Sequence, residues 1–181
     1  MKGRLDINAI NMGLAKATKE FVAFCSTMSD EQFFKPHGEK WSAARQVKHL
    51  VQSTTISGYA FKFPKWLVSL AGGKANRPSR DYEVLVEKYA VKLQQGGKAP
   101  ARFIPKPVSP GYGREKLLNE FAASMNSLAK AMTRKRSEQD MDKYVIPHPL
   151  LGKITLRELG YFTIHHTYHH LNSIRERANG N

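Results

Sequence analysis

Cysteine is almost absent from this sequence of 181 residues, in which Cys25 is the only one. A single cysteine cannot form an internal disulfide, so the fold must be stable without one, and nothing points to an oxidising compartment. Cys25 lies in an apolar stretch with Phe21, Val22 and Phe24. Because a reactive thiol needs exposure and a lowered pKa, this setting predicts a small core residue.

Long hydrophobic runs are also missing. No segment approaches the roughly 20 apolar residues that cross a bilayer. The first ten residues, MKGRLDINAI, lack the apolar run and the cleavage site of a signal peptide. We therefore expect a cytoplasmic protein with no membrane partner. The apolar content of 41% and the charged content of 24% are typical of globular proteins, and the length predicts one domain over residues 1–181.

Acidic residues are few, with 15 Asp and Glu against 29 Lys and Arg, so the net charge is +14. Such a surplus favours polyanions or small acidic substrates as partners. The basic residues are nevertheless spread along the chain, and the densest cluster is only Arg134 to Arg136. No zinc-finger spacing, RNP-like motif or recognition helix accompanies them. We therefore predict a diffuse basic field with weak, sequence-independent DNA binding and no specific nucleic-acid partner.

Alternating strand patterns are weak as well, and helical spacing of apolar residues dominates the chain. Asp6 and Ser42 are good N-caps, and Thr155 with Glu158 forms a capping box. The sequence predicts an all-α fold, a four-helix bundle with long connections. Its long helices are expected at residues 6–28, 42–64, 115–138 and 155–177.

The connections between these helices are less regular. Ser29 and Gln32 fit the cap of a short extra turn, and Pro64 is expected to end or kink the second long helix. A further helical pattern covers residues 81–95. The stretch 96–113 is rich in proline and glycine and is predicted to be a loop. Short strands stay open as an alternative at 100–110 and 143–147.

Four of the seven histidines lie in the run HHTYHH of the last predicted helix. The apolar stripe of this helix consists of Leu156, Leu159, Phe162 and Ile174. At about 100° per residue, His166 and His170 fall within that stripe, whereas His165 and His169 fall toward its edge. A buried i, i+4 pair of histidines is either a hydrogen-bonded core pair or part of a metal site. His169 is a secondary candidate, as a supporting partner or a substitute ligand.

Two motifs resemble those of the DinB-like superfamily. The segment Trp41–Leu50, WSAARQVKHL, resembles that family's Trp-Ser helix start followed by a His-Leu pair. The segment 148–159, HPLLGKITLREL, resembles the approach to its last helix, and the run from His166 to Leu171 resembles its closing histidine motif. The resemblance covers most of the chain in helix order and is specific in these motifs.

This resemblance implies a site for a divalent metal, because in the family one histidine of the second helix and two of the last helix are ligands. The implied ligands here are His49, His166 and His170. Three neutral imidazoles leave open positions on a zinc or nickel ion, as in catalytic sites. The sequence departs from many relatives at Ser173, where they carry glutamine, and in the poorly matched region 70–113.

The activity implied by the resemblance is metal-dependent transfer of a small thiol, or hydrolysis of an amide in a thiol conjugate. His148 is a candidate for a catalytic role at the mouth of the pocket, and Tyr112 and Arg102 are weaker candidates for substrate contact. A metal-free interaction module and a weak basic nucleic-acid binder stay open as alternatives. The sequence does not decide between a monomer and a homodimer.

Overall fold

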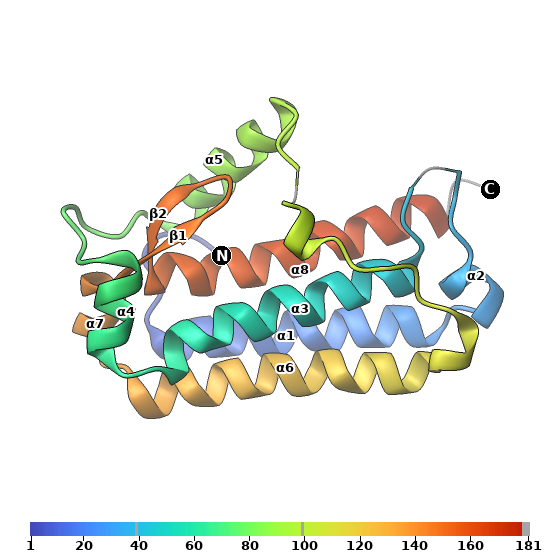
Figure 1. Cartoon of the computed structure of the whole chain (residues 1–181), viewed down its shortest axis with the longest axis horizontal. Coiled ribbons are helices and arrows are strands. Elements are labelled where there is room, and N and C mark those ends of the chain that lie inside the picture. Colours follow the sequence, from blue (N-terminus) through green and yellow to red (C-terminus); the bar gives the residue numbers. More distant parts are fainter. Residues whose placement is uncertain (39, 99, 179–181) are drawn as a thin grey trace.

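The computed structural model describes residues 1–38, 40–98 and 100–178. Four long helices lie side by side and form the body of the molecule (Figure 1). Each contacts two of the others, in the cyclic order α3, α6, α1, α8. The predicted all-α four-helix bundle is confirmed. These helices are α1 (Ile7–Ser26), α3 (Ala43–Lys62), α6 (Arg114–Lys135) and α8 (Leu156–Ala178).

Shorter elements make the connections between the long helices. The helices are α2 (Asp30–Phe34), α4 (Lys65–Gly72), α5 (Tyr82–Gln94) and α7 (Glu138–Lys143), with 3₁₀ turns η1 (Ala101–Phe103) and η2 (Pro110–Tyr112). Strands β1 (Val145–His148) and β2 (Gly152–Thr155) form an antiparallel hairpin. In its register, Val145 lies opposite Thr155 and His148 lies opposite Gly152. The structure therefore has strands near 143–147 and none in the described part of 100–110.

Local capping explains where several helices begin. Ser29 and Gln32 form the expected capping box at α2, and the side chain of Ser42 accepts a hydrogen bond from the backbone of Arg45. Thr155 and Glu158 also exchange the two hydrogen bonds of a capping box at α8. These hydrogen bonds satisfy backbone N–H groups that have no partner within the helix.

One predicted boundary was wrong, and one helix was not predicted. Helix α6 ends at Lys135 instead of continuing to residue 138, because Arg136 is extended and Ser137 caps the separate helix α7. Helix α4, which begins directly after Pro64, was not predicted from the sequence. Proline ends α3 as expected, but it also suits the position just before a new helix.

The core fills the space between the four long helices. Apolar residues of α1 and α6 that were expected to face inward are buried, including Ile10, Phe21, Phe121 and Leu128. Cys25 is fully buried, as expected, and burial raises the pKa of its thiol to about 12. Such a thiol is protonated at neutral pH and is not poised to react. In the described part of the chain, no helix is long and apolar enough to cross a membrane.

Candidate metal centre

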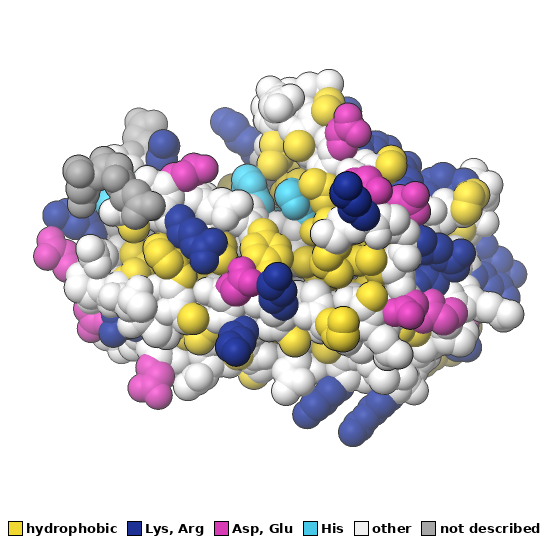
Figure 2. Space-filling model, turned by 180° about the vertical axis from the view of Figure 1, so that it is seen from behind, with side chains coloured by type: hydrophobic (Ala, Val, Ile, Leu, Met, Phe, Trp, Pro, Cys, Tyr) yellow, Lys and Arg dark blue, Asp and Glu magenta, His cyan; other side chains and the backbone are white. Residues whose placement is uncertain are grey.

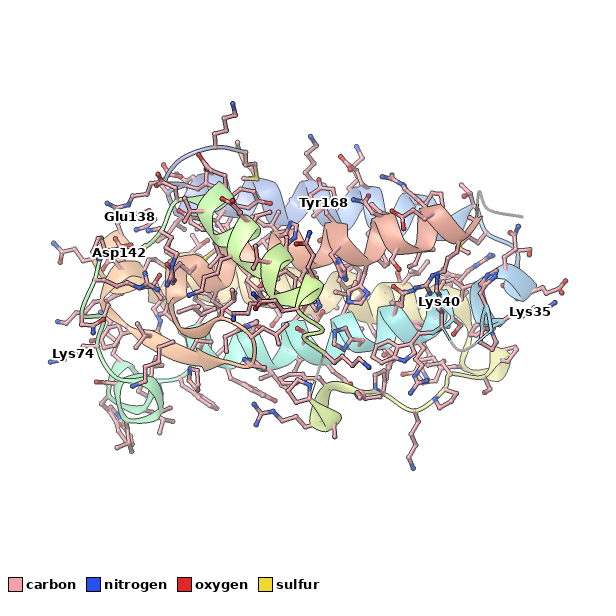
Figure 3. The ribbon with its side chains drawn as sticks, turned by 90° about the horizontal axis from the view of Figure 1, so that it is seen from above. Lys35, Lys40, Lys74, Glu138, Asp142 and Tyr168 are labelled. Atoms are coloured by element: carbon pink, nitrogen blue, oxygen red, sulfur yellow. The ribbon has the colours of Figure 1, made fainter. Side chains whose placement is uncertain are left out.

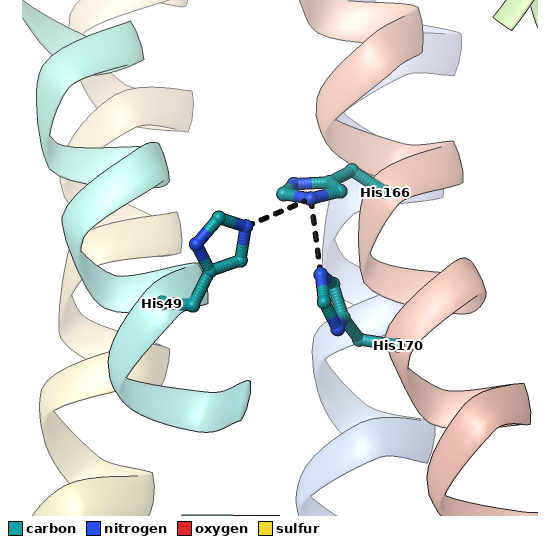
Figure 4. Close-up of side chains that lie close together, drawn as sticks. All are labelled: His49, His166 and His170. Carbon is teal, nitrogen blue, oxygen red and sulfur yellow. Dashed lines mark hydrogen bonds between the residues drawn. The ribbon is translucent and has the colours of Figure 1, made fainter. Parts of the chain in front are cut away.

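Three histidines from two helices converge inside the bundle. Helix α3 contributes His49, and α8 contributes His166 and His170 (Figure 4). The Nε2 atom of His166 lies 3.2 Å from Nε2 of His49 and 3.1 Å from Nε2 of His170. Ligands about 2.1 Å from a common zinc ion would be roughly 3–3.5 Å apart. The expected pair of α8 histidines thus faces the histidine of α3 at a spacing that suits a metal.

The other ring nitrogens of two of these histidines have fixed partners. Nδ1 of His49 lies 2.7 Å from the carbonyl oxygen of Phe103, and Nδ1 of His170 lies 2.8 Å from Oε1 of Gln46. The amide nitrogen of Gln46 faces the carbonyl oxygen of Trp41 at 3.5 Å, which orients Oε1 toward His170. Because both partners are acceptors, both Nδ1 atoms carry the proton and act as donors.

This choice of tautomer determines what occupies the centre of the site. A neutral imidazole with a proton on Nδ1 presents a lone pair at Nε2, so His49 and His170 both direct lone pairs at Nε2 of His166. One N–H group of His166 cannot donate well to both. A cation at the centre satisfies all three nitrogens together, and neutral imidazoles with hydrogen-bonded Nδ1 atoms are the common form of histidine ligand. The residues therefore fit a divalent ion better than a hydrogen-bonded core cluster.

Burial keeps these three histidines neutral. Their exposed fractions are 5% for His49, 6% for His166 and 9% for His170. Burial lowers the pKa of His166 and His170 well below 6.5, and the neighbouring histidines lower it further. Burial also lowers the pKa of His49, more than its hydrogen bond to Phe103 raises it. The ligands therefore need not lose protons at neutral pH before a metal binds.

Gln46 offers a direct test of this arrangement. We expect Gln46→Ala to weaken metal affinity by about 10–100-fold, because His170 would lose the acceptor that fixes its tautomer and orientation. Gln46→Glu retains an acceptor and should retain most of the affinity. Gln52→Ala, also on α3, is the matched control, since Oε1 of Gln52 is buried without a hydrogen-bond partner. Competition with a chromophoric chelator measures the affinities, and equal affinity for Gln46→Ala and the parent would contradict the role.

Aromatic rings enclose the three histidines. Phe162 stacks on His166 with ring centroids 4.8 Å apart, and Trp41 meets His49 edge to face at 5.5 Å. Tyr89 of α5 packs edge to face near His166 at 6.4 Å. These rings place apolar surface around the site, which lowers the local dielectric constant and strengthens any interaction with an ion.

The remaining histidines of the HHTYHH run lie beside the site and do not join it. His165 and His169 are half-buried, and their rings lie 5.8 and 6.2 Å from the ring of Tyr89. Among the described residues, the group whose ligand atoms lie close enough to share an ion contains His49, His166 and His170. His169 packs against the ring of His170 at 5.2 Å, so it supports the position of that ring by contact.

His148 lies one ring away from the histidine cluster. Its ring contacts Phe162 at 4.3 Å, and Phe162 in turn stacks on His166. Its Nδ1 atom accepts hydrogen bonds from the backbone N–H groups of Leu150 and Leu151, both at 3.2 Å. These bonds hold the turn of the β hairpin, and they leave the proton on Nε2. A catalytic role for His148 stays a prediction.

The burial of His148 also leads to a prediction of how the stability of the protein depends on pH. Burial lowers its pKa from 6.5 to about 4. Between these values the unfolded chain binds a proton that the native protein does not, so the free energy of unfolding decreases as pH falls from 6.5 toward 4. We expect His148→Asn, which retains an acceptor for the turn, to make this decrease shallower by up to about 1 kcal/mol per pH unit.

Urea unfolding of the metal-free protein at several pH values measures this slope. His37→Asn is the matched control, because His37 is exposed and its substitution should leave the slope unchanged. A slope that is the same in His148→Asn and in the parent protein would show that His148 is not buried as a neutral ring.

The two weaker candidates for substrate contact lie at different distances from the site. The hydroxyl of Tyr112 donates to Glu120 at 2.6 Å and accepts from Lys48 at 2.7 Å, so it ties η2 to α3 and α6. Arg102 is exposed on η1, with its guanidinium 5.2 Å from the ring centroid of Phe103. Arg102 is therefore next to the residue whose carbonyl holds His49, whereas Tyr112 is engaged elsewhere.

Sequence reasoning missed the groups that orient the ligands. Gln46 was detectable in principle, because a glutamine three residues before His49 lies on the same buried helix face. The carbonyl oxygen of Phe103 was not detectable, since any residue carries a carbonyl and the loop around it has no periodic pattern. Tyr89 was visible as part of a helical pattern, but nothing indicated that α5 would pack over the histidines.

A groove also lies away from the histidine cluster. A groove of about 520 Å³ runs between α1 and α6, and its lining includes Leu14, Val22 and Met125. No histidine, cysteine or carboxylate is among its described lining residues. This groove therefore lacks the groups that bind a metal or transfer a proton.

Comparison with models of protein families identifies the family of this chain. A family model described as the DinB superfamily matches residues 14–174, which include all three converging histidines. No curated protein and no solved structure matches the chain. A family match over nearly the whole length, together with the helical bundle, leads to one conclusion: the chain belongs to the DinB superfamily.

Proposed function

We propose that this protein is a metal-dependent enzyme that acts on a small molecule, with His49, His166 and His170 as the metal ligands. The observation that carries the proposal is the convergence of three Nε2 atoms, two of which present lone pairs because their rings donate from Nδ1. Zinc and nickel suit imidazole ligands of this kind, and affinity alone does not choose between them.

Three neutral ligands leave the charge of a divalent ion uncompensated. The site therefore favours an anionic group, such as a thiolate or a carboxylate, over a neutral one. When bound, a divalent ion would supply a Lewis acid with open positions, which lowers the pKa of a thiol or water or polarises a carbonyl. The enclosing rings of Trp41, Tyr89 and Phe162 hold the reacting groups away from bulk water.

We infer that the substrate is a low-molecular-weight thiol, and that the reaction is transfer of its sulfur to an acceptor or hydrolysis of an amide in its conjugate. Membership in the DinB superfamily supports this class. Two arginines beside the site also suit an acidic thiol. Arg45 lies 4.8 Å from the ring centroid of Trp41, and Arg177 donates to the carbonyl oxygen of Trp41 at 2.7 Å. Their charge would attract the carboxylates of such a substrate.

The experiment uses protein stripped of metal and then reloaded with zinc or nickel. Consumption of cysteine or glutathione in the presence of an electrophilic acceptor, and hydrolysis of an amide-linked thiol conjugate, are measured separately. We expect turnover in one assay, dependent on metal, lost in His49→Gln and retained in His165→Ala. Metal binding without turnover would contradict the enzyme proposal. Absence of metal binding would favour a metal-free interaction module instead.

A further inference from the structure

Exposed hydrophobic side chains gather where α3 ends and α4 follows. The structure describes ten exposed large hydrophobic residues, and five of them lie between residues 56 and 70. Trp66 and Leu70 are exposed to 68% and 77%, and they lie one turn apart on α4. Single exposed apolar residues are ordinary, but a cluster of this size indicates a binding surface. We call it the α3–α4 patch, and it consists of Ile56, Tyr59, Phe63, Trp66 and Leu70.

Basic residues outnumber acidic ones in the chain around this patch, although Lys48, Lys65, Arg77 and Arg80 form ion pairs with Glu120, Asp140 and Glu158. Residues 41–80 contain seven Lys and Arg and no Asp or Glu. Helix α6, which packs against α3, continues this pattern, with no acidic residue between Glu120 and Glu138. Lys62 and Lys65 flank the patch in the chain, and Lys74 projects from the end of the molecule that carries α4 (Figure 3). By contrast, basic and acidic side chains are interspersed on the face seen from behind (Figure 2).

An acidic residue pairs with Lys65 beside the patch. Asp140 of α7 lies 2.7 Å from Nζ of Lys65, but its side chain is buried to nine-tenths. Lys62 places its ammonium group 5.9 Å from the ring centroid of Tyr59, so a basic group is held directly against the exposed rings. The outer surface of the patch therefore offers apolar area together with positive charge.

We infer that the α3–α4 patch binds the surface of a membrane that contains anionic phospholipids. Tryptophan, tyrosine and phenylalanine are favoured at the boundary between headgroups and acyl chains, where apolar rings are covered while their edges stay wet. Lysines beside them attract anionic headgroups, and their aliphatic stems also cover apolar surface. The helices would lie on the surface and not cross it. Membrane binding by this patch would revise the expectation of no membrane partner, and it does not depend on the metal site.

Two other occupants fit the patch less well. Single-stranded nucleic acid needs free aromatic faces along a groove. Here the rings of Tyr59 and Phe63 stack on each other, 5.2 Å apart at 6°, and the aliphatic residues Ile56 and Leu70 offer no stacking face. A second copy of the chain would bring the same lysines together, and like charges across an interface oppose association.

The test is co-sedimentation of the full chain with phosphatidylcholine vesicles, with and without phosphatidylserine. Binding should require phosphatidylserine and weaken as salt increases, because salt screens the attraction. Combined Trp66→Ala and Leu70→Ala substitutions should lower the partition coefficient by about tenfold or more, because both side chains are expected to enter the interface. Lys74→Ala should lower it about fivefold.

Control variants replace residues of the same types on α1. Met12→Ala removes a side chain that is 71% exposed, and Lys19→Ala removes one exposed positive charge. Both should bind vesicles like the parent. The fluorescence of Trp66 should shift to shorter wavelength with anionic vesicles, and this shift should vanish in Trp66→Phe, which retains Trp41.

Several results would overturn the inference. One is no binding to phosphatidylserine vesicles at low salt. Another is binding that the patch variants do not weaken, because a different surface would then be responsible. Binding of a single-stranded oligonucleotide in place of vesicles, lost in the same variants, would assign the patch to nucleic acid. Self-association lost in those variants, without vesicle binding, would assign it to a second copy.

Discussion

Replacing His166 with alanine is expected to abolish tight metal binding while the bundle stays folded. His166 holds the central position, since its Nε2 atom is the one that faces both His49 and His170. Without it, two imidazoles on different helices would have to hold the ion alone. We expect affinity to fall more than about 100-fold, beyond the 10–100-fold typical of a supporting partner. Isothermal titration with zinc, together with metal analysis of the purified protein, measures the loss.

The control is His165→Ala, one residue earlier on the same helix. His165 contacts Tyr89 and does not belong to the group of three histidines that could share an ion, so its removal should leave the metal affinity unchanged. The reverse result, with loss in His165→Ala and retention in His166→Ala, would show that a different pair binds the ion. Circular dichroism and thermal unfolding of both variants separate a lost ligand from a lost fold.

The position of the histidine pair was predictable because helical geometry is regular. Once α8 is recognised as a helix with one apolar stripe, the direction of each side chain follows from about 100° per residue. His166 and His170 are buried as that geometry requires, and His165 and His169 are half-buried at the edge. His49 was assigned by resemblance to a family, since a single histidine on a helix face carries no such signal.

Other features depended on contacts between segments far apart in the chain. The carbonyl of Phe103 reaches His49 only because the irregular loop crosses α3 at that point. The break between α6 and α7 has instead a local cause, because Ser137 and Asp140 form a capping box that begins a new helix. Sequence patterns report local preference, and these outcomes were decided by tertiary contacts and caps.

Arg157→Met is expected to destabilise the fold more than Arg4→Met or Asp142→Asn. The side chain of Arg157 is fully buried, yet it is charged. Its guanidinium donates to Asp142, to the carbonyl of Leu5 and to the carbonyl of Glu138. Asp142 and Glu138 lie together at one end of the molecule (Figure 3). Arg157 thus joins α8 to α7 and to the segment before α1.

Methionine fills a similar volume but satisfies none of these acceptors. Removing one partner of a buried ion pair costs about 3–5 kcal/mol. Here the carbonyls of Leu5 and Glu138 also lose a buried donor, whereas Asp142, which is 26% exposed, keeps its hydrogen bonds from Arg4 and Ser79. Total stability of a domain is only about 5–15 kcal/mol, so a substantial part would be lost. Urea unfolding monitored by circular dichroism gives the free energy of unfolding for the variant and the parent.

Arg4→Met tests whether the burial of Arg157 or the charge of Asp142 determines the loss of stability. Arg4 also pairs with Asp142, at 2.5 Å, but its side chain is 60% exposed. An exposed pair contributes about 0–1 kcal/mol, so Arg4→Met should change stability little. Asp142→Asn adds a second check. If Arg157 acts through this pair, its substitution should cost less when Asp142 is already neutral, since the ion pair between Arg157 and Asp142 is then already absent. Equal losses in Arg4→Met and Arg157→Met would instead mean that the charge of Asp142, and not the burial of Arg157, determines the effect.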